Sequence, residues 1–256
     1  MGDQAVTACL LIIGNEILSG RTQDKNLGYL AERLNDWGVR LMEARVIPDV
    51  PETIIATLNE VRVRFDYVFT TGGIGPTHDD ITSECVARAF GLPHGLHPEA
   101  HAILQAHYAP GELNEARLRM AKTPEGATLI ENPISKAPGF QVENVFVMAG
   151  VPAIMQVMVD SLRNRVTGGA PMLSRTIKVG LPEGGVAADL GALQDDFPDI
   201  EIGSYPYYHQ ADGYGVRLVL RGTDAARLDQ AVERLDDIIG RLGGKGDWEP
   251  VMAPSS

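Results

Sequence analysis

The chain has 256 residues, of which 22 are Lys or Arg and 34 are Asp or Glu, giving a formal net charge of −12. This acidic balance argues against a broad surface for nucleic acid or for an anionic membrane. No apolar run approaches the roughly 20 residues that a membrane-spanning helix needs. The two cysteines, Cys9 and Cys85, lie in apolar surroundings, which predicts buried free thiols and a cytoplasmic protein.

Short apolar runs alternate with helical patterns through the first two thirds of the chain. The expected strands are 7–13, 39–47, 66–71, 127–131 and 144–150, and the expected helices are 24–38, 51–61, 81–90, 97–107, 114–121 and 152–165. Nearly continuous apolar strands between amphipathic helices predict a mostly parallel sheet with helices on both faces. Residues 1–168 are therefore expected to form an α/β domain of three layers, αβα.

The pattern changes near Thr167–Pro171, where glycine and proline interrupt it, and we place a linker there. A compact module follows over 172–245. Its expected strands are 174–181, 200–208 and 214–222, and its expected helices are 185–197 and 224–242. This order predicts a small α+β domain. Residues 246–256 are expected to be a flexible tail.

The stretch TTGGIGPTHDDIT, from Thr70 to Thr82, follows an expected strand and carries Gly72, Gly73 and Gly75. Ligands of open α/β sheets bind beyond the carboxyl ends of the strands. Glycines let backbone N–H groups approach a phosphate closely, and the helix that follows offers its positive end. The stretch therefore predicts a phosphate-binding loop, with a simple tight turn as the alternative.

Two adjacent aspartates, Asp79 and Asp80, stand at the expected helix entrance. Thr77 and Asp80 have the spacing of a capping box, so one aspartate is explained by the helix end alone. Two carboxylates beside a phosphate repel it, at roughly 3 kcal/mol per charge pair for about 5 Å and an effective dielectric near 20. A divalent cation (Mg, Mn or Co) held by carboxylate and phosphate oxygens offsets that repulsion. We therefore expect a metal-bridged phosphate or pyrophosphate site.

Several segments together resemble one family. They are TTGGIGPTHDDIT, IIGNEILSGRTQDKNLGYLAERLNDWGV from Ile12 to Val39, NPISKAPGF from Asn132 to Phe140, and MAGVPAIMQVM from Met148 to Met158. The chain is similar to the molybdopterin-binding (MoaB/Mog-like) domain family, in the version found in competence/damage-inducible protein A. Longer members end in a nicotinamide-nucleotide deamidase domain, and 256 residues leave no room for one.

The resemblance implies more than one activity. Relatives in molybdenum-cofactor synthesis bind a pterin phosphate or its adenylylated form. The domain in competence/damage-inducible protein A is associated with metal-dependent hydrolysis of ADP-ribose, and a similar domain in some FAD synthases with hydrolysis of FAD. Ala149, Ile154 and Ser135 depart from residues that are common in the family, which leaves the substrate open.

The predicted roles of the site residues follow from the loop and the resemblance. Thr70, Thr71, Gly72, Gly73 and Gly75 would hold phosphate. Asp79 and Asp80 would be catalytic and, with Glu16 after the first strand, would hold the metal. Asn15, Asn26, Ser135 and Lys136 would contact the ligand.

Three functions follow from these predictions. The first is a metal-dependent nucleotide pyrophosphatase acting on an ADP-ribose-like substrate. The second is a molybdopterin-binding or adenylyl-transfer protein of cofactor synthesis, and the third is a non-catalytic interaction protein. The expected ligand is a small nucleotide or pterin, with molybdopterin a candidate. We expect no nucleic-acid or membrane partner, and we expect a homo-oligomer.

Overall fold

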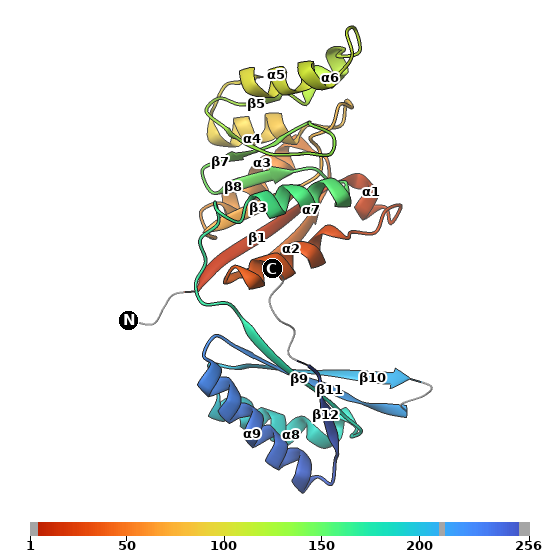
Figure 1. Cartoon of the computed structure of the whole chain (residues 1–256), viewed down its shortest axis with the longest axis vertical. Coiled ribbons are helices and arrows are strands. Elements are labelled where there is room, and N and C mark those ends of the chain that lie inside the picture. The colour runs from red at the N-terminus through yellow and green to blue at the C-terminus, as the bar shows by residue number, and fades with distance from the viewer. Residues whose placement is uncertain (1–4, 210–212, 251–256) are drawn as a thin grey trace. The chain divides into compact units, whose positions relative to one another are not determined.

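The computed structural model describes residues 5–209 and 213–250, and it divides the chain into two compact units, 1–169 and 170–256 (Figure 1). No helix in the described part of the chain is both long and apolar enough to cross a membrane.

The first unit is built on a six-stranded sheet with the order β2-β1-β3-β8-β7-β6. The strands are β1 (Val6–Ile13), β2 (Val39–Ile47), β3 (Tyr67–Thr71), β6 (Thr128–Ile130), β7 (Gly139–Val142) and β8 (Val145–Met148). Strand β1 pairs in parallel with β2 and β3, and β3 pairs in parallel with β8. Only the pairings of β7, with β8 and β6, are antiparallel in this sheet. The prediction of a mostly parallel sheet is therefore confirmed.

Helices cover both faces of this sheet (Figure 1). They are α1 (Asn15–Leu18), α2 (Asn26–Asp36), α3 (Pro51–Val61), α4 (Thr82–Phe90), α5 (Pro98–His107), α6 (Glu115–Arg119) and α7 (Pro152–Ser161). Because strand side chains alternate between faces, Leu10 and Ile12 pack with residues of α2 and α7. Cys9 and Leu11 pack on the other face with residues of α3 and α4. This alternation makes the three layers.

A two-stranded sheet beside α4, β4–β5, was not predicted from the sequence. Strand β4 (His94–Leu96) pairs antiparallel with β5 (Lys122–Pro124), and α5 and α6 connect them. Ala100, Leu104 and Ala121 form a small core of their own in this region. This two-stranded sheet places His94 of β4 and Lys122 of β5 in the pocket at the start of α4.

The second unit is an antiparallel sheet with two helices. The elements are β9 (Leu173–Val179), α8 (Glu183–Asp196), β10 (Glu201–His209), β11 (Gly213–Gly222), α9 (Ala225–Arg241) and β12 (Gly246–Trp248). The strand order is β10-β11-β9-β12. One apolar core joins the sheet to both helices, as the predicted α+β module requires.

Two sequence predictions about smaller features have different outcomes. The prediction of a flexible tail from residue 246 was wrong for Gly246–Trp248, because these residues pair with β9 as an edge strand. Residues 251–256 lie outside the described part of the chain. The prediction of buried free thiols is confirmed for Cys9 and Cys85. Burial raises the pKa of both thiols to about 11.

Candidate functional site

The loop between β3 and α4 requires glycine at its first two positions. Gly72 has φ 101° and Gly73 has φ 68°, which are backbone conformations that favour glycine. A Cβ on Gly72 would lie 2.1 Å from the carbonyl oxygen of Ile13, and one on Gly73 would lie 2.1 Å from Oγ1 of Thr82. The loop therefore runs tightly against the end of β1 and the start of α4.

Three threonines around this loop bury hydroxyl groups that have no hydrogen-bond partner among the described residues. They are Thr70 and Thr71 at the end of β3 and Thr82 at the start of α4, all at most 1% exposed. Alternation along β3 places Thr71 on the face covered by α2 and α7, and Thr70 on the face covered by α4. An unpartnered buried hydroxyl costs about 1–3 kcal/mol, and these three lie at one end of the sheet, on both of its faces.

A second pair of unpartnered atoms lies at the start of α2. Asn26 is 4% exposed, and its side-chain N–H group donates to the carbonyl of Gly150 at 2.9 Å. In the part of the chain that the structure describes, its Oδ1 atom and Oδ2 of Asp24 are buried without a hydrogen-bond partner. Gly150 lies against the loop, because a Cβ there would be 3.2 Å from the Cα of Gly72. The chain of contacts through Gly150 thus connects Asn26 to the glycine loop.

The two aspartates of the loop differ in their surroundings. Asp80 is partly buried, and its Oδ2 accepts from the backbone N–H of Thr77 at 2.8 Å and from the Thr77 hydroxyl. These bonds close a turn that ends before α4 begins, and α4 has Ile81 as its N-cap with no side-chain cap. The capping-box alternative is therefore wrong for this helix. Asp79 is exposed, and hydrogen bonding from Thr77, then from its own backbone N–H, lowers its pKa, with a smaller contribution from the charge of His78.

The structure does not assemble the predicted three-carboxylate metal site. Asn15 and Glu16 are exposed at the start of α1, and the Asn15 backbone N–H donates to Asp49 at 2.8 Å. The carboxylate of Glu16 folds back over Gly14, where a Cβ would lie 2.5 Å from Oε1. Among residues 5–209 and 213–250, no group of three or more His, Cys, Asp or Glu is placed to hold a metal ion. A cation between Asp79 and Asp80 would need further ligand atoms.

Ser135 and Lys136 lie on a loop organised by Asn132. The Asn132 amide donates to Oγ of Ser135 at 2.5 Å and to the carbonyl of Ala137 at 2.8 Å. Lys136 has φ 63° and is exposed, and it lines a pocket of about 440 Å³ together with Arg165. Gly75 and Asp80 line a different pocket. Lys136 therefore does not line the pocket that the glycine loop borders, although Pro138 lines both pockets.

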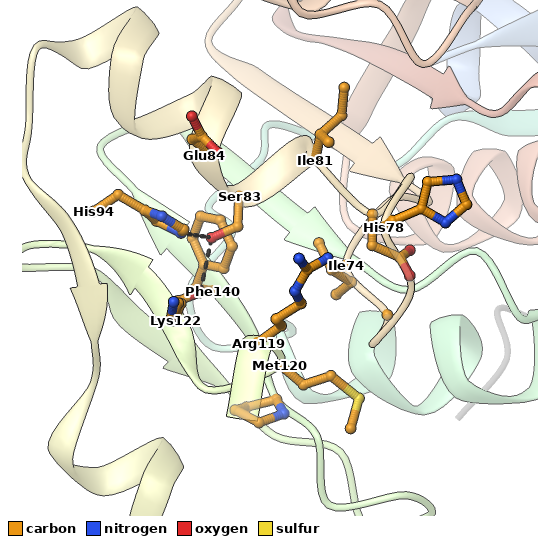
Figure 2. Close-up of a pocket in the computed structure, with 13 residues that line it drawn as sticks. Ile74, His78, Ile81, Ser83, Glu84, His94, Arg119, Met120, Lys122 and Phe140 are labelled. Carbon is orange, nitrogen blue, oxygen red and sulfur yellow. Dashed lines mark hydrogen bonds between the residues drawn. The ribbon is translucent and has the colours of Figure 1, made fainter. Parts of the chain in front are cut away.

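The pocket beside the glycine loop has a volume of about 210 Å³. Figure 2 shows Ser83, His94, Arg119 and Lys122 among the side chains that line it. These four residues were not predicted as site residues, because they come from the start of α4, from the two-stranded β4–β5 sheet and from α6. Single polar residues from two helices and two three-residue strands leave no periodic signal in the sequence.

Comparison with protein families decides the relationship of the chain. Residues 9–168 match the model of a probable molybdopterin binding domain. The chain belongs to this family. The matched range contains the glycine loop, Asn26 and Gly150, which form the site described above. Residues 171–241 match a second model, the middle domain of FAD synthase.

Relatives of this molybdopterin-binding family member span different lengths. A protein of Archaeoglobus fulgidus is 33% identical over 230 residues, covering 90% of this chain and 96% of the relative. A CinA-like protein of Citrifermentans bemidjiense is 36% identical over 244 residues, covering 88% of this chain but only 56% of that protein. A solved structure of CinA from Thermoplasma acidophilum, described as of unknown function, is 32% identical with a TM-score of 0.60. It covers 63% of this chain and 98% of the solved one.

Proposed function

We propose that the first unit binds a phosphate-bearing pterin of the molybdopterin type, with its phosphate at the β3–α4 loop. The observation that carries this proposal is the set of buried, unpartnered hydroxyls of Thr70, Thr71 and Thr82 around Gly72 and Gly73. Hydroxyls donate hydrogen bonds to phosphate oxygens, and glycines let the backbone come close to the anion. Membership of a family named for molybdopterin binding supports the pterin.

The atoms near α2 complement the other part of such a ligand. Oδ1 of Asn26 and Oδ2 of Asp24 can only accept hydrogen bonds, and both are buried without a donor. The N–H groups of a heterocycle are donors that suit them. The Asn26 amide is held in place by its bond to Gly150, so Oδ1 keeps a fixed direction. Acceptors near α2 and hydroxyl donors near β3 therefore match the two ends of a pterin phosphate.

A titration of the purified protein with molybdopterin, and with the same pterin lacking its phosphate, tests this proposal. We expect the phosphate-bearing ligand to bind more tightly, and we expect Thr71→Val and Asn26→Ala to weaken it. Glu32→Gln, which neutralises an exposed carboxylate farther along α2, is the matched control. Equal affinity of both ligands, or unchanged affinity in both site variants, would remove the loop from the proposal.

Metal-dependent hydrolysis of a pyrophosphate bond in an ADP-ribose-like nucleotide is a second candidate. Two observations favour it: Asp79 is exposed with a lowered pKa, so it is ionised beside the loop, and the second unit matches a domain of FAD synthase. No described cluster is ready to hold the cation, so a divalent ion would need the ligand's own oxygens.

Release of AMP from ADP-ribose and FAD, measured with Mg²⁺, Mn²⁺ or Co²⁺ and with EDTA, distinguishes the candidates. Hydrolysis predicts that the protein releases AMP only when the metal is present. This release should be lost in Asp79→Asn or Asp80→Asn but not in Glu32→Gln. Binding of the pterin, with no AMP released from ADP-ribose or FAD, supports the pterin proposal. Adenylyl transfer to a pterin would consume ATP instead, and binding of no ligand would leave an interaction protein. Assembly into a homo-oligomer stays a prediction.

A further inference from the structure

The six-stranded sheet of the first unit ends in two strands of different length. Strand β6 has three residues, whereas β2 has nine and, among the described residues, pairs only with β1. The backbone N–H and C=O groups on the outer side of an edge strand can pair with another chain. A short edge strand limits such pairing, so β2 is the edge that can accept a partner strand.

One face of β2 exposes apolar side chains. Ala44 and Val46 pair with residues of β1 that pack against α2 and α7, so they point to that face. Ala44 is nevertheless exposed, and Val46 is 41% exposed. Met42 is 61% exposed and has no partner on β1, because the register of the two strands shifts beside it. The described part of the chain therefore leaves apolar surface uncovered along this edge.

The other face of β2 carries an acid and a base on either side of Ala44. Arg45 donates to Glu43 and, at 2.6 Å, to Glu60 of α3. Arg64 pairs with Glu43 at 3.3 Å. These two acids and two bases form a network without net charge, and the side chains of Glu43 and Arg45 are 27% and 25% exposed. One acid and one base are thus accessible in part at the edge of the sheet.

Antiparallel pairing of β2 with a second copy of itself has a restricted register. Directly opposite residues point to the same face of a sheet, so a twofold axis through the sheet must set one residue opposite its own copy. An axis at Glu43 or Arg45 would place like charges opposite each other, which destabilises a strand pair. An axis at Ala44 places Glu43 opposite Arg45 of the second copy, and Arg45 opposite Glu43. The same register places Met42 opposite Val46 and puts the smallest of these side chains at the axis.

We propose that β2 forms the interface of a symmetric homodimer, in which it pairs antiparallel with β2 of a second copy about a twofold axis at Ala44. The partner is a second copy because the strand is complementary to itself in charge and in apolar surface, as a twofold interface requires. The two sheets then become one continuous sheet. The inference does not depend on the ligand of the β3–α4 loop, and it assigns a surface to the homo-oligomer expected from the sequence.

Sedimentation velocity of the full chain tests this interface. The unmodified protein should be a dimer. Ala44→Asp and Ala44→Lys each set two like charges opposite each other at the axis, so each should raise the Kd of the dimer at least about tenfold. An equimolar mixture of the two variants should form a dimer again, because Asp then lies opposite Lys. Thr128→Asp, at an exposed position of the other edge strand, is the matched control and should stay dimeric.

A disulfide across the axis tests the register. Opposite Cα atoms of an antiparallel pair lie about 4.5–5.5 Å apart, which is within the range of a disulfide. Cys9 and Cys85 are buried, so an introduced thiol on β2 is the accessible one in the described structure. Oxidised Ala44→Cys should give a covalent dimer, whereas Val46→Cys should not, because position 46 lies opposite position 42 of the second copy.

Three results would overturn the proposal. The first is an unmodified protein that stays monomeric up to about 100 μM. The second is a dimer that Ala44→Asp and Thr128→Asp leave equally intact, which would place the interface elsewhere. The third is a covalent dimer of Val46→Cys in the absence of one of Ala44→Cys. Circular dichroism shows that each variant is folded, and recovery of the dimer in the Asp and Lys mixture distinguishes lost pairing from lost folding.

Discussion

Replacement of Thr71 by valine separates a ligand-binding hydroxyl from a structural one. The Thr71 hydroxyl is buried at the end of β3 and has no hydrogen-bond partner in residues 5–209 and 213–250. Valine keeps the branched shape of the side chain and removes the unpartnered polar atom. Because such an atom costs about 1–3 kcal/mol, we expect the free energy of unfolding to rise by about 1 kcal/mol in the absence of ligand.

The same substitution should weaken ligand binding. A hydrogen bond from a neutral hydroxyl contributes about 1 kcal/mol, which corresponds to about a fivefold increase in Kd. A gain in stability combined with a loss of affinity is the pattern expected of a preformed binding site. The matched control is Thr123→Val, since Thr123 is 4% exposed and its hydroxyl donates to the carbonyl of Pro124 at 3.1 Å. That variant should lose about 1 kcal/mol of stability and keep its affinity.

Urea unfolding monitored by Trp37 fluorescence measures the change in the relevant unit. Trp37 is 7% exposed in the core of the first unit, and Trp248 belongs to the second, so a Trp248→Phe background isolates the signal. Calorimetric titration supplies the affinity. If Thr71→Val destabilises the unit as Thr123→Val does and leaves Kd unchanged, the reasoning from unpartnered hydroxyls is refuted.

Three further predictions concern the loop and its surroundings. Gly73→Ala should destabilise the first unit by about 2–4 kcal/mol, the sum of a left-handed backbone and a steric clash, whereas Gly91→Ala, with φ 66° and open space around it, should cost only about 1 kcal/mol; urea unfolding compares them. The carboxyl of Asp79 should titrate below the ordinary aspartate pKa in NMR, and Thr77→Val should raise it. Because its folded pKa is depressed, its stabilisation is present above the ordinary value and lost as pH falls through the depressed one. Cys85 should react with a thiol reagent at pH 8 only on unfolding, since its pKa is about 11 and it is 1% exposed; fast reaction of the native protein would contradict its burial.

The sequence predicted the first unit well where periodicity was strong. Strands such as Val6–Ile13 and helices such as Pro51–Val61 carry enough apolar residues to indicate their type and faces. The two-stranded β4–β5 sheet was missed because its strands have three residues each and are separated by α5 and α6. Strand β7 was not among the expected strands, since four residues are too few for a clear periodic pattern.

The site was predicted in part for the same physical reasons. The loop after β3 was identified, because three glycines next to a buried strand are a local pattern. Glu16 was expected beside it, since loops after parallel strands emerge at one sheet edge, but its side chain folds over Gly14. Arg119 of α6 bonds to the Thr77 carbonyl of the loop, and Lys122 of β5 lines the neighbouring pocket. Tertiary packing of this kind has no signal in one sequence.

Calorimetric titration of a phosphate-bearing pterin into the protein and into its Gly73→Ala variant tests the central claim most directly. Binding at the β3–α4 loop predicts measurable affinity for the phosphate-bearing form, little for the form without phosphate, and a large loss in a folded Gly73→Ala protein, whose loop cannot keep its backbone conformation. Gly91→Ala should bind as the unmodified protein does. Equal binding of both pterins by all three proteins would contradict the assignment of the loop as the phosphate site.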